Sequence, residues 1–206
     1  MPETQRRTQA ERRALARAKI TSAGLEALAA KGYDAMTFSD VAKRAGLSTG
    51  ALAHYFPRKQ DLCLAILEDA VAGGVQRFRR RVKKAASLPD RDERILDDIF
   101  IVFYGPFYQA FLSVQVVART DAELRLALDR ISEDGVRQIS EIAAAGWEVG
   151  VAPADPNWLT FVWLVVDTAR GVAVSQARDS IGVSSEVWVL ARRLLLRELG
   201  EIRGNP

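Results

Sequence analysis

The chain carries, at residues 37–59, the stretch TFSDVAKRAGLSTGALAHYFPRK, which contains the start and stop signals of two short helices. Apolar residues recur at i, i+3, i+4 and i+7 across 38–45, which is the spacing of one helix face. Thr37 precedes this run and Asp40 follows three residues later, so the pair predicts a capping box with Asp in the usual place of Glu. Gly46 supplies the left-handed residue that ends such a helix.

A second, shorter helix is predicted directly after this glycine. Ser48 is a favoured N-cap residue, and Leu52, Tyr55 and Phe56 repeat the apolar spacing. Leu47 is apolar and is expected to fill the gap between the two helices. Two helices joined by a short turn that contains glycine form a helix-turn-helix.

The second helix has small or polar residues where contact with DNA would occur. The small residues, which allow close approach of the backbone, are Thr49, Gly50, Ala51 and Ala53. His54 and Tyr55 offer ring donors to phosphates or base edges, and the charge of Lys59 favours a phosphate at the start of the next helix. The alternative is an ordinary helical hairpin with a polar face. It explains the caps and the apolar spacing but not all these side chains together, so DNA binding is favoured.

The net charge of +3 is unevenly distributed along the chain. Residues 1–60 carry 11 Lys and Arg against 5 Asp and Glu, a net charge of +6, and residues 61–84 carry a net +3. Residues 85–206 carry a net −6. A basic front half indicates a polyanionic partner, although a solvated basic surface would show the same charge.

At residues 37–62 the sequence also resembles the DNA-binding signature of the TetR/AcrR transcription regulators, and the resemblance extends over roughly 13–72. It implies an all-α homodimer with an N-terminal three-helix DNA-binding domain and a larger helical domain that binds a small molecule and dimerises. Position by position, Thr37, Ser39 and Lys59 are similar to the family's phosphate contacts. The positions similar to its recognition surface are Ser48, Thr49, Gly50, Ala51, His54 and Tyr55. Many members carry an aromatic residue where this chain has Ala53.

The chain is expected to divide into four parts. They are a mobile basic arm (1–12), the helix-turn-helix domain (13–60), a connecting helix (61–86) and a ligand-binding and dimerisation domain (91–206). The helix to which residues 61–86 belong is expected to open earlier, at Pro57. The break at 87–90, which reads Ser-Leu-Pro-Asp, marks the domain boundary. Further helices are predicted at about 91–118, 121–149, 156–177 and 184–200.

The C-terminal part is rich in aromatic residues. They can fill a core, or they can line an apolar ligand cavity with a few polar handles. The resemblance favours a cavity for an unidentified, largely apolar effector. The candidate ligand-binding residues are Phe103, Tyr104, Phe107, Tyr108, Phe111, Gln115, Trp147 and Trp163.

The last two predicted helices are apolar on more than one face. A helix with two apolar faces buries one in its own core and the other against a partner. A two-fold homodimer is therefore expected, with candidate interface residues Trp158, Val162, Val187, Leu190, Ala191 and Leu194. Asp167 and Arg170 interrupt the apolar run; they can pair within the helix, bridge the dimer or face a ligand.

These observations favour a cytoplasmic repressor that a small molecule releases from a palindromic operator in double-stranded DNA; the alternative is a structural DNA-binding protein without ligand sensing. An enzyme is not expected. The one histidine, His54, lies in the predicted DNA-facing helix, and the one cysteine, Cys63, has no histidine near it in sequence with which to form a catalytic pair. No cofactor or metal is expected. The uncharged stretch 99–118 has the length of a membrane span, but Gly105-Pro106 and its polar residues favour a core helix.

Overall fold

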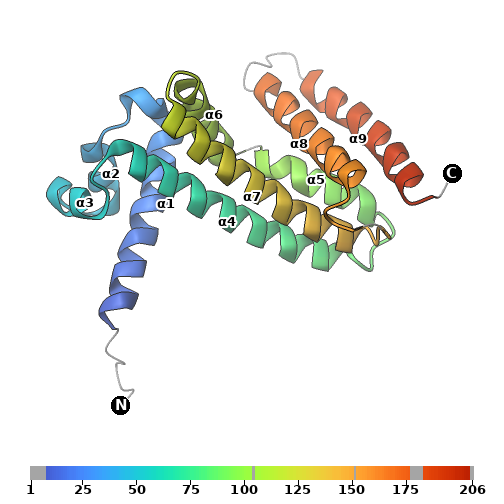
Figure 1. Ribbon diagram of the computed structural model, residues 1–206, viewed down its shortest axis with the longest axis horizontal. Helices are drawn as coiled ribbons and strands as arrows, with labels where there is room; N and C mark the ends of the chain where they lie inside the picture. The colour runs from blue at the N-terminus through green and yellow to red at the C-terminus, as the bar shows by residue number, and fades with distance from the viewer. Residues whose placement is uncertain (1–7, 104, 151, 177–182, 205–206) are drawn as a thin grey trace. The chain divides into compact units, whose positions relative to one another are not determined.

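The computed structural model describes residues 8–103, 105–150, 152–176 and 183–204, and within these ranges every regular element is a helix (Figure 1). The all-α prediction is therefore confirmed. The helices are α1 (Gln9–Ala35), α2 (Phe38–Ala45), α3 (Thr49–Tyr55), α4 (Lys59–Ala85), α5 (Arg91–Phe103), α6 (Pro106–Ala118), α7 (Ala122–Gly146), α8 (Pro156–Gln176) and α9 (Val183–Ile202).

The helices form two compact units, each with its own core. The first unit reaches Ala70 and also includes Gln109–Leu128, and the second unit holds Val71–Tyr108 and the chain from Asp129 on. The turn at 87–90 does separate α4 from α5, as expected. The compact units nevertheless divide inside α4, and 109–128 belongs with the helix-turn-helix region rather than with the rest of the C-terminal part.

In the first unit α1 packs on α2, and α2 packs on α3. Its core is built from the apolar positions of the predicted helical patterns, and its fully buried members include Ile20, Ala27, Leu28, Val41, Ala45, Leu52 and Leu62. Thr21 is also buried, and its hydroxyl donates to the carboxylate of Asp69 at 2.7 Å, which ties α1 to α4. At the C-terminal end of α1, a Cβ placed on Gly32 would lie 3.7 Å from Cβ of Ser113 in α6.

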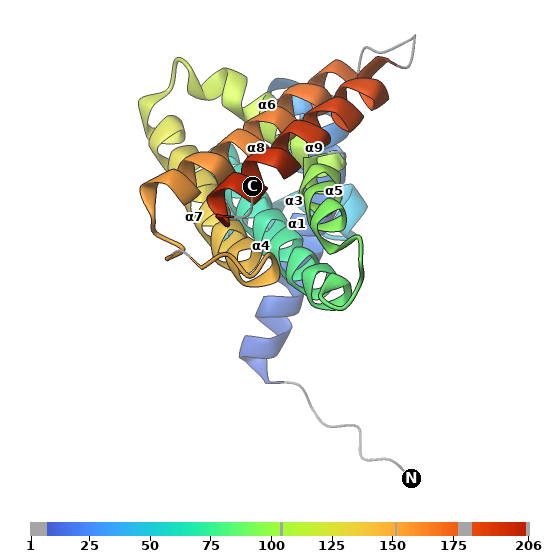
Figure 2. The ribbon, with the colours of Figure 1, turned by 90° about the vertical axis from the view of Figure 1, so that its right-hand side faces the viewer.

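In the second unit α8 packs on α5 and α9, and α8 and α9 lie side by side in both views (Figures 1 and 2). Trp147 and Trp158 are fully buried and meet edge to face, with ring centroids 5.9 Å apart. Asp97 of α5 accepts hydrogen bonds from the Trp188 indole at 2.8 Å and from Arg192 at 2.6 Å, which holds α9 to α5. The hydrogen bonds of Asp97 and the aromatic core together position the outer surfaces of α8 and α9.

Several helix boundaries differ from the prediction. The first helix begins at Gln9, because Thr8 and Glu11 form a capping box, so residues 9–12 of the predicted mobile arm are helical. The predicted helix at 91–118 is two helices, α5 and α6, and α6 begins at Pro106. Proline suits the first position of a helix, where no N–H partner is needed. The helix expected to open at Pro57 opens at Lys59 instead.

The stretch 99–118, which has the length of a membrane span, is divided between α5 and α6 in this way. By length and composition α8 is itself apolar enough to cross a membrane. However, its residues Trp158, Val162, Val165 and Val166 are buried within the second unit, as in the core helix of a folded domain.

Candidate DNA-binding site

The start of α2 is fixed by the predicted capping box. The Thr37 hydroxyl accepts a hydrogen bond from the Asp40 N–H at 3.2 Å, and the Asp40 carboxylate accepts from the Thr37 N–H at 3.0 Å and from the Thr37 hydroxyl at 2.8 Å. Lys31 of α1 donates to the same carboxylate at 2.6 Å. The Lys31 hydrogen bond, followed by those from Thr37, lowers the pKa of Asp40 to about 2. The cap therefore stays ionised and intact at neutral pH.

The turn between α2 and α3 follows the predicted glycine stop. Gly46 is left-handed, with φ 65° and ψ 38°, and the N–H groups of Gly46 and Leu47 donate back to Lys43 and Ala42 in the Schellman pattern. Ser48 then caps α3 by accepting a hydrogen bond from the Ala51 N–H at 3.1 Å. The three-residue turn 46–48 therefore fixes α3 relative to α2.

The outer face of α2 and α3 presents most of the predicted DNA contacts to solvent. Thr37, Ser39, Ser48, Thr49, Gly50 and His54 are exposed, whereas Ala51, Tyr55 and Lys59 are half-buried. The rings of His54 and Tyr55 meet edge to face with centroids 6.2 Å apart, so they form one aromatic edge of this surface. Leu52 on the opposite side of α3 is fully buried and anchors the helix.

Lys59 has contacts that the sequence did not indicate. Its ammonium group donates to the carbonyl oxygen of Asp34 at 2.9 Å and lies 4.9 Å from the ring centroid of Tyr33. Both partners belong to the end of α1. The ammonium carries three hydrogens, so Lys59 can hold the end of α1 and still offer a donor to a phosphate.

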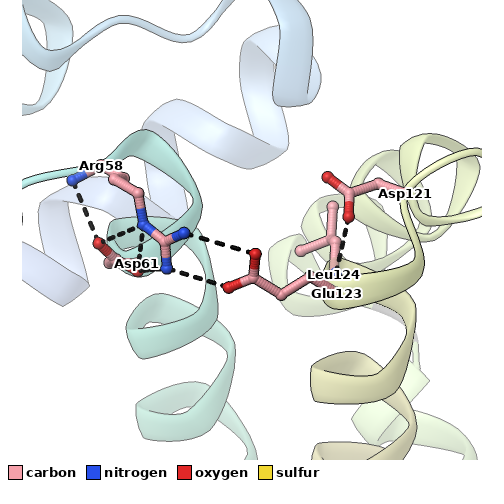
Figure 3. A network of polar contacts seen from close by, with 5 residues as sticks. All are labelled: Arg58, Asp61, Asp121, Glu123 and Leu124. Carbon is pink, nitrogen blue, oxygen red and sulfur yellow. Dashed lines mark hydrogen bonds and ion pairs between the residues drawn. The ribbon is translucent and has the colours of Figure 1, made fainter.

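Arg58 is a further residue of this region, and its contacts were not expected from the sequence (Figure 3). Its guanidinium contacts the Asp61 carboxylate at 2.7 Å and, from Nη2 and Nη1, the Glu123 carboxylate at 3.1 and 3.5 Å. The Arg58 N–H also donates to Asp61 at 3.2 Å, which caps α4. Both carboxylates raise the pKa of Arg58, and Arg58 lowers that of Asp61. The network therefore connects Arg58, shortly after the end of α3, to Glu123 in the first turn of α7, within the first unit.

We expect the two carboxylates of this network to contribute unequally to stability. Asp61→Ala removes a helix cap as well as an ion pair and should lower the free energy of unfolding by about 1 kcal/mol. Glu123→Ala removes only an exposed ion pair and should cost less. Urea unfolding at low salt and at 0.5 M salt separates the two, because added salt should erase the Glu123 effect and leave the Asp61 effect. An equal loss in both variants at high salt would contradict this assignment.

The predicted ligand-binding residues fall into separate groups. Phe103 and Tyr108 meet edge to face at 5.5 Å between ring centroids, and Arg170 of α8 lies over Phe103 and over Trp163, 5.4 and 5.7 Å from their centroids. These residues, from α5, α6 and α8 of the second unit, form what we call the Arg170 aromatic cluster: Phe103, Tyr108, Trp163 and Arg170. The structure thus brings three of the predicted residues together around a cation.

The other predicted ligand residues lie elsewhere. Trp147 is fully buried against Trp158 and Phe161, and its indole faces the backbone of Asp92 at the opposite end of α5, about 16 Å from Phe103 at 1.5 Å per residue. It fills the core of the second unit, away from Phe103, and its place in a ligand site stays a prediction. Phe111 is buried and Gln115 is exposed in the first unit, so Gln115 does not line a buried cavity there. Phe107 is half-buried, and Tyr104 lies outside the described residues.

The predicted dimer residues also divide into two sets. Val187, Leu190 and Leu194 of α9 are 47%, 50% and 51% exposed, and Ala191 beside them is half-buried. Trp158 and Val162 of α8 are buried in the core of their own unit, and their assignment to the interface is wrong. The exposed apolar residue of α8 is instead Leu164, which is 51% exposed.

Cys63 is buried in α4, where burial raises the pKa of its thiol to about 12. Because the thiolate is the reactive form, Cys63 should remain unlabelled by a maleimide or by a disulfide reagent at pH 8 in the folded protein. It should react once the chain is unfolded in urea. Rapid labelling of the native protein would show that the thiol is accessible. Among the described residues no cluster of His, Cys, Asp and Glu is suited to a metal ion.

A helix-turn-helix with an exposed second helix, in a chain whose described elements are all helices, defines the class of helical DNA-binding transcriptional regulators. Residues 20–66 match the family model of the bacterial regulatory proteins of the tetR family. The transcriptional regulator CymR of Pseudomonas putida is 33% identical over 169 residues, which cover 82% of this chain and 83% of that protein. The chain therefore belongs to the TetR family.

Solved structures show the same fold. A TetR-family transcriptional regulator from Streptomyces coelicolor aligns with a TM-score of 0.62 at 19% identity, over 91% of this chain and 99% of that one. The regulator FadR of Bacillus subtilis, solved in complex with stearoyl-CoA, aligns with a TM-score of 0.61 at 19% identity, over 84% and 96% of the two chains. The resemblance inferred from residues 37–62 is thus confirmed at the level of family and fold.

Proposed function

We propose that the protein is a repressor that binds a palindromic operator through α3 and is released by a small-molecule effector. The observation that carries the proposal is the exposed surface of α3, which presents Thr49, Gly50 and His54 from a short helix fixed by the Gly46 turn and the Ser48 cap. A rigid helix with small and polar outward residues suits the major groove. The predicted phosphate contacts at Thr37, Ser39 and Lys59 lie at the starts of α2 and α4 on either side of it.

The same proposal includes a homodimer. Val187, Leu190 and Leu194 lie at i, i+3 and i+7 and give α9 an exposed apolar face, to which Leu164 of α8 adds a further exposed apolar side chain. An apolar face of this kind is expected at a protein interface, and a two-fold axis is the commonest solution for identical chains. Two copies would then present two α3 helices to half-sites about 34–36 Å apart.

Coupling between effector and DNA would pass through Gln109–Leu128. This segment belongs to the same compact unit as the helix-turn-helix, and the Arg58–Glu123 ion pair joins it to the residues that follow α3. α6 and α7 would adopt two arrangements, each with its own position of α3. An effector that binds more tightly to the arrangement in which α3 does not fit the operator would increase the population of that arrangement and so lower operator affinity. FadR shows that a protein of this fold binds an acyl-CoA. A regulator of this kind acts in the bacterial cytoplasm.

Enrichment of genomic DNA fragments by the purified protein tests the proposal. The wild-type chain should retain discrete fragments that share an inverted repeat, and the variant with both Tyr55→Ala and Lys59→Ala should not. A circular dichroism melt of the variant controls for folding, because Lys59 also contacts the end of α1. Full operator binding by the variant would refute the assigned surface, and retention of all fragments alike would indicate a structural DNA-binding protein.

A further inference from the structure

Arg58 lies between the predicted recognition helix α3 and helix α4. It follows Tyr55, the last residue of α3, by three positions, and it directly precedes Lys59, a predicted phosphate contact. Its side chain is 57% exposed. A guanidinium offers five N–H donors in a planar fork that suits the oxygens of a phosphate. In the free protein, however, two carboxylates already hold this fork.

The two carboxylates contact Arg58 in different ways. Asp61 lies three positions later in the chain and accepts hydrogen bonds both from the Arg58 backbone N–H at 3.2 Å and from the side chain, at 2.7 Å from Nη2. It therefore caps α4 and stays beside Arg58 wherever this segment moves. Glu123 lies 65 positions away in α7 and contacts only the Arg58 side chain. Arg58 can therefore leave Glu123 without any loss of the cap of α4.

Glu123 does not cap its own helix either. The residue that caps α7 is Asp121, whose carboxylate accepts a hydrogen bond from the Leu124 N–H at 3.0 Å (Figure 3). Glu123 stands in the first turn of α7, where a negative charge favours a helix, but that effect needs no contact with Arg58. Its side chain is 66% exposed, and an exposed ion pair contributes little to stability. The stability of the fold thus does not explain why Glu123 meets Arg58.

The contact uses the part of the guanidinium that a phosphate would also need. Nη2 donates to Glu123 at 3.1 Å and Nη1 at 3.5 Å, so the carboxylate lies along the edge formed by these two nitrogens. Two oxygens of one anion fit such an edge, whether the anion is a carboxylate or a phosphate. Glu123 and a DNA phosphate would therefore compete for it. With Asp61 included, the network carries a net negative charge, which is unfavourable next to a polyanion.

We propose that Arg58 is a phosphate-binding residue of the DNA-binding site and that Glu123 restrains it in the free protein. When DNA binds, Arg58 exchanges Glu123 for a phosphate, and its contact with Asp61 keeps the guanidinium in position. Any change that holds Glu123 against Arg58 then lowers the affinity for DNA. The inference rests on the proposed function, because it adds a contact to the same DNA-binding surface and names the residue that regulates this contact.

The exchange predicts opposite effects for the two residues. Arg58→Gln should weaken DNA binding about tenfold, and it should reduce the slope of log affinity against log salt concentration by about one, as expected for one lost phosphate contact. Glu123→Gln should strengthen binding about fivefold and leave this slope unchanged, because the same phosphates are contacted. In the Arg58→Gln background, Glu123→Gln should change the affinity by no more than about twofold, since the competition no longer exists.

Fluorescence anisotropy of the full-length variants at several salt concentrations measures these effects. The probes are an operator fragment recovered by the genomic enrichment and a duplex of random sequence. A phosphate contact carries no sequence information, so Arg58→Gln should weaken the binding of both duplexes by the same factor. Glu133→Gln removes the same charge from an exposed position further along α7 and is the matched control, which should change the affinity by less than about twofold. A thermal melt confirms that each variant is folded.

The inference is overturned if Arg58→Gln keeps the affinity and the salt slope of the wild type, or if Glu123→Gln weakens binding. It is also overturned if Glu123→Gln gives its full gain without Arg58, because Glu123 would then act by general repulsion of DNA. The random duplex separates this inference from the proposed repressor. If no operator is recovered but the random duplex responds as stated, the repressor proposal fails and the role of Arg58 stands. A wild-type chain that binds neither duplex would overturn both.

Discussion

Gly50→Glu is expected to abolish operator binding without lowering the stability of the fold. Gly50 is exposed in α3, and a Cβ built there meets no atom within 4 Å, so a side chain fits without strain. A glutamate should in fact favour the helix slightly, because glycine is among the poorest helix formers. Against DNA it would place a negative charge close to phosphates. Like charges brought together cost several kcal/mol, which corresponds to roughly a hundredfold or greater loss of affinity.

Fluorescence anisotropy with an operator fragment and a thermal melt measure the two effects separately. Gly50→Ala adds a side chain without a charge and should retain affinity to within about tenfold. Gln76→Glu adds the same charge on an exposed position of α4 in the second unit and should change little. If Gly50→Glu binds the operator like the wild type, α3 does not enter the groove.

Leu190→Glu is expected to dissociate the proposed dimer and so to remove high-affinity DNA binding. Leu190 lies on the exposed apolar face of α9, at 50% exposure within one chain, so the substitution leaves the core of the unit intact. In a dimer the same position would be covered, and a buried unpaired carboxylate costs several kcal/mol. The chain should then sediment as a monomer of 22.7 kDa, and operator affinity should fall at least a hundredfold because each monomer binds one half-site only.

The control for this variant is Leu126→Glu, which places the same charge on an apolar residue of α7 that is 56% exposed. It should remain dimeric and retain operator binding. Sedimentation velocity across a hundredfold range of protein concentration compares the two variants with the wild type. A Leu190→Glu variant that still sediments as a dimer would remove α9 from the proposed interface.

The DNA-binding region could be predicted largely from sequence because its structure depends on short-range signals. Thr37 with Asp40, Gly46 and Ser48 each act on residues within four positions, and the hydrogen bonds that they make are those expected of a capping box, a left-handed stop and an N-cap. The exposed and buried sides of α3 also follow its apolar spacing, with Leu52 inside and His54 outside.

Long-range contacts were not predictable in the same way. The Arg58–Glu123 pair joins residues 65 positions apart, and no local pattern marks it. Only the Arg58–Asp61 contact has a signal in the sequence, which is the i, i+3 spacing of the two residues. Lys59 was expected to face phosphate alone, because its contacts with Asp34 and Tyr33 depend on how the end of α1 packs against α4.

The apolar helices of the second unit show a related limit. Trp158 and Val162 were assigned to the dimer, because α8 is apolar on most of its circumference and its sequence does not show which face meets its own core. In α9 the two apolar stripes are distinct, and Val187, Leu190 and Leu194 are indeed exposed, whereas Trp188, Leu195 and Leu199 are buried. Periodicity therefore identifies an exposed surface only where the apolar residues form distinct stripes, as in α9 but not in α8.

The most direct test of the claim that α3 lies in the major groove uses a DNA-cleaving iron chelate attached to a single cysteine in place of Ala53. Ala53 is exposed on α3, and the native Cys63 is buried with a raised thiol pKa, so the label should go to the new site alone. We expect cleavage of the operator in two clusters, one in the major groove of each half-site, about 10–10.5 base pairs or a multiple of that apart. Strong cleavage from a label at Gln76→Cys on α4, with none from position 53, would contradict the placement of α3 in the groove.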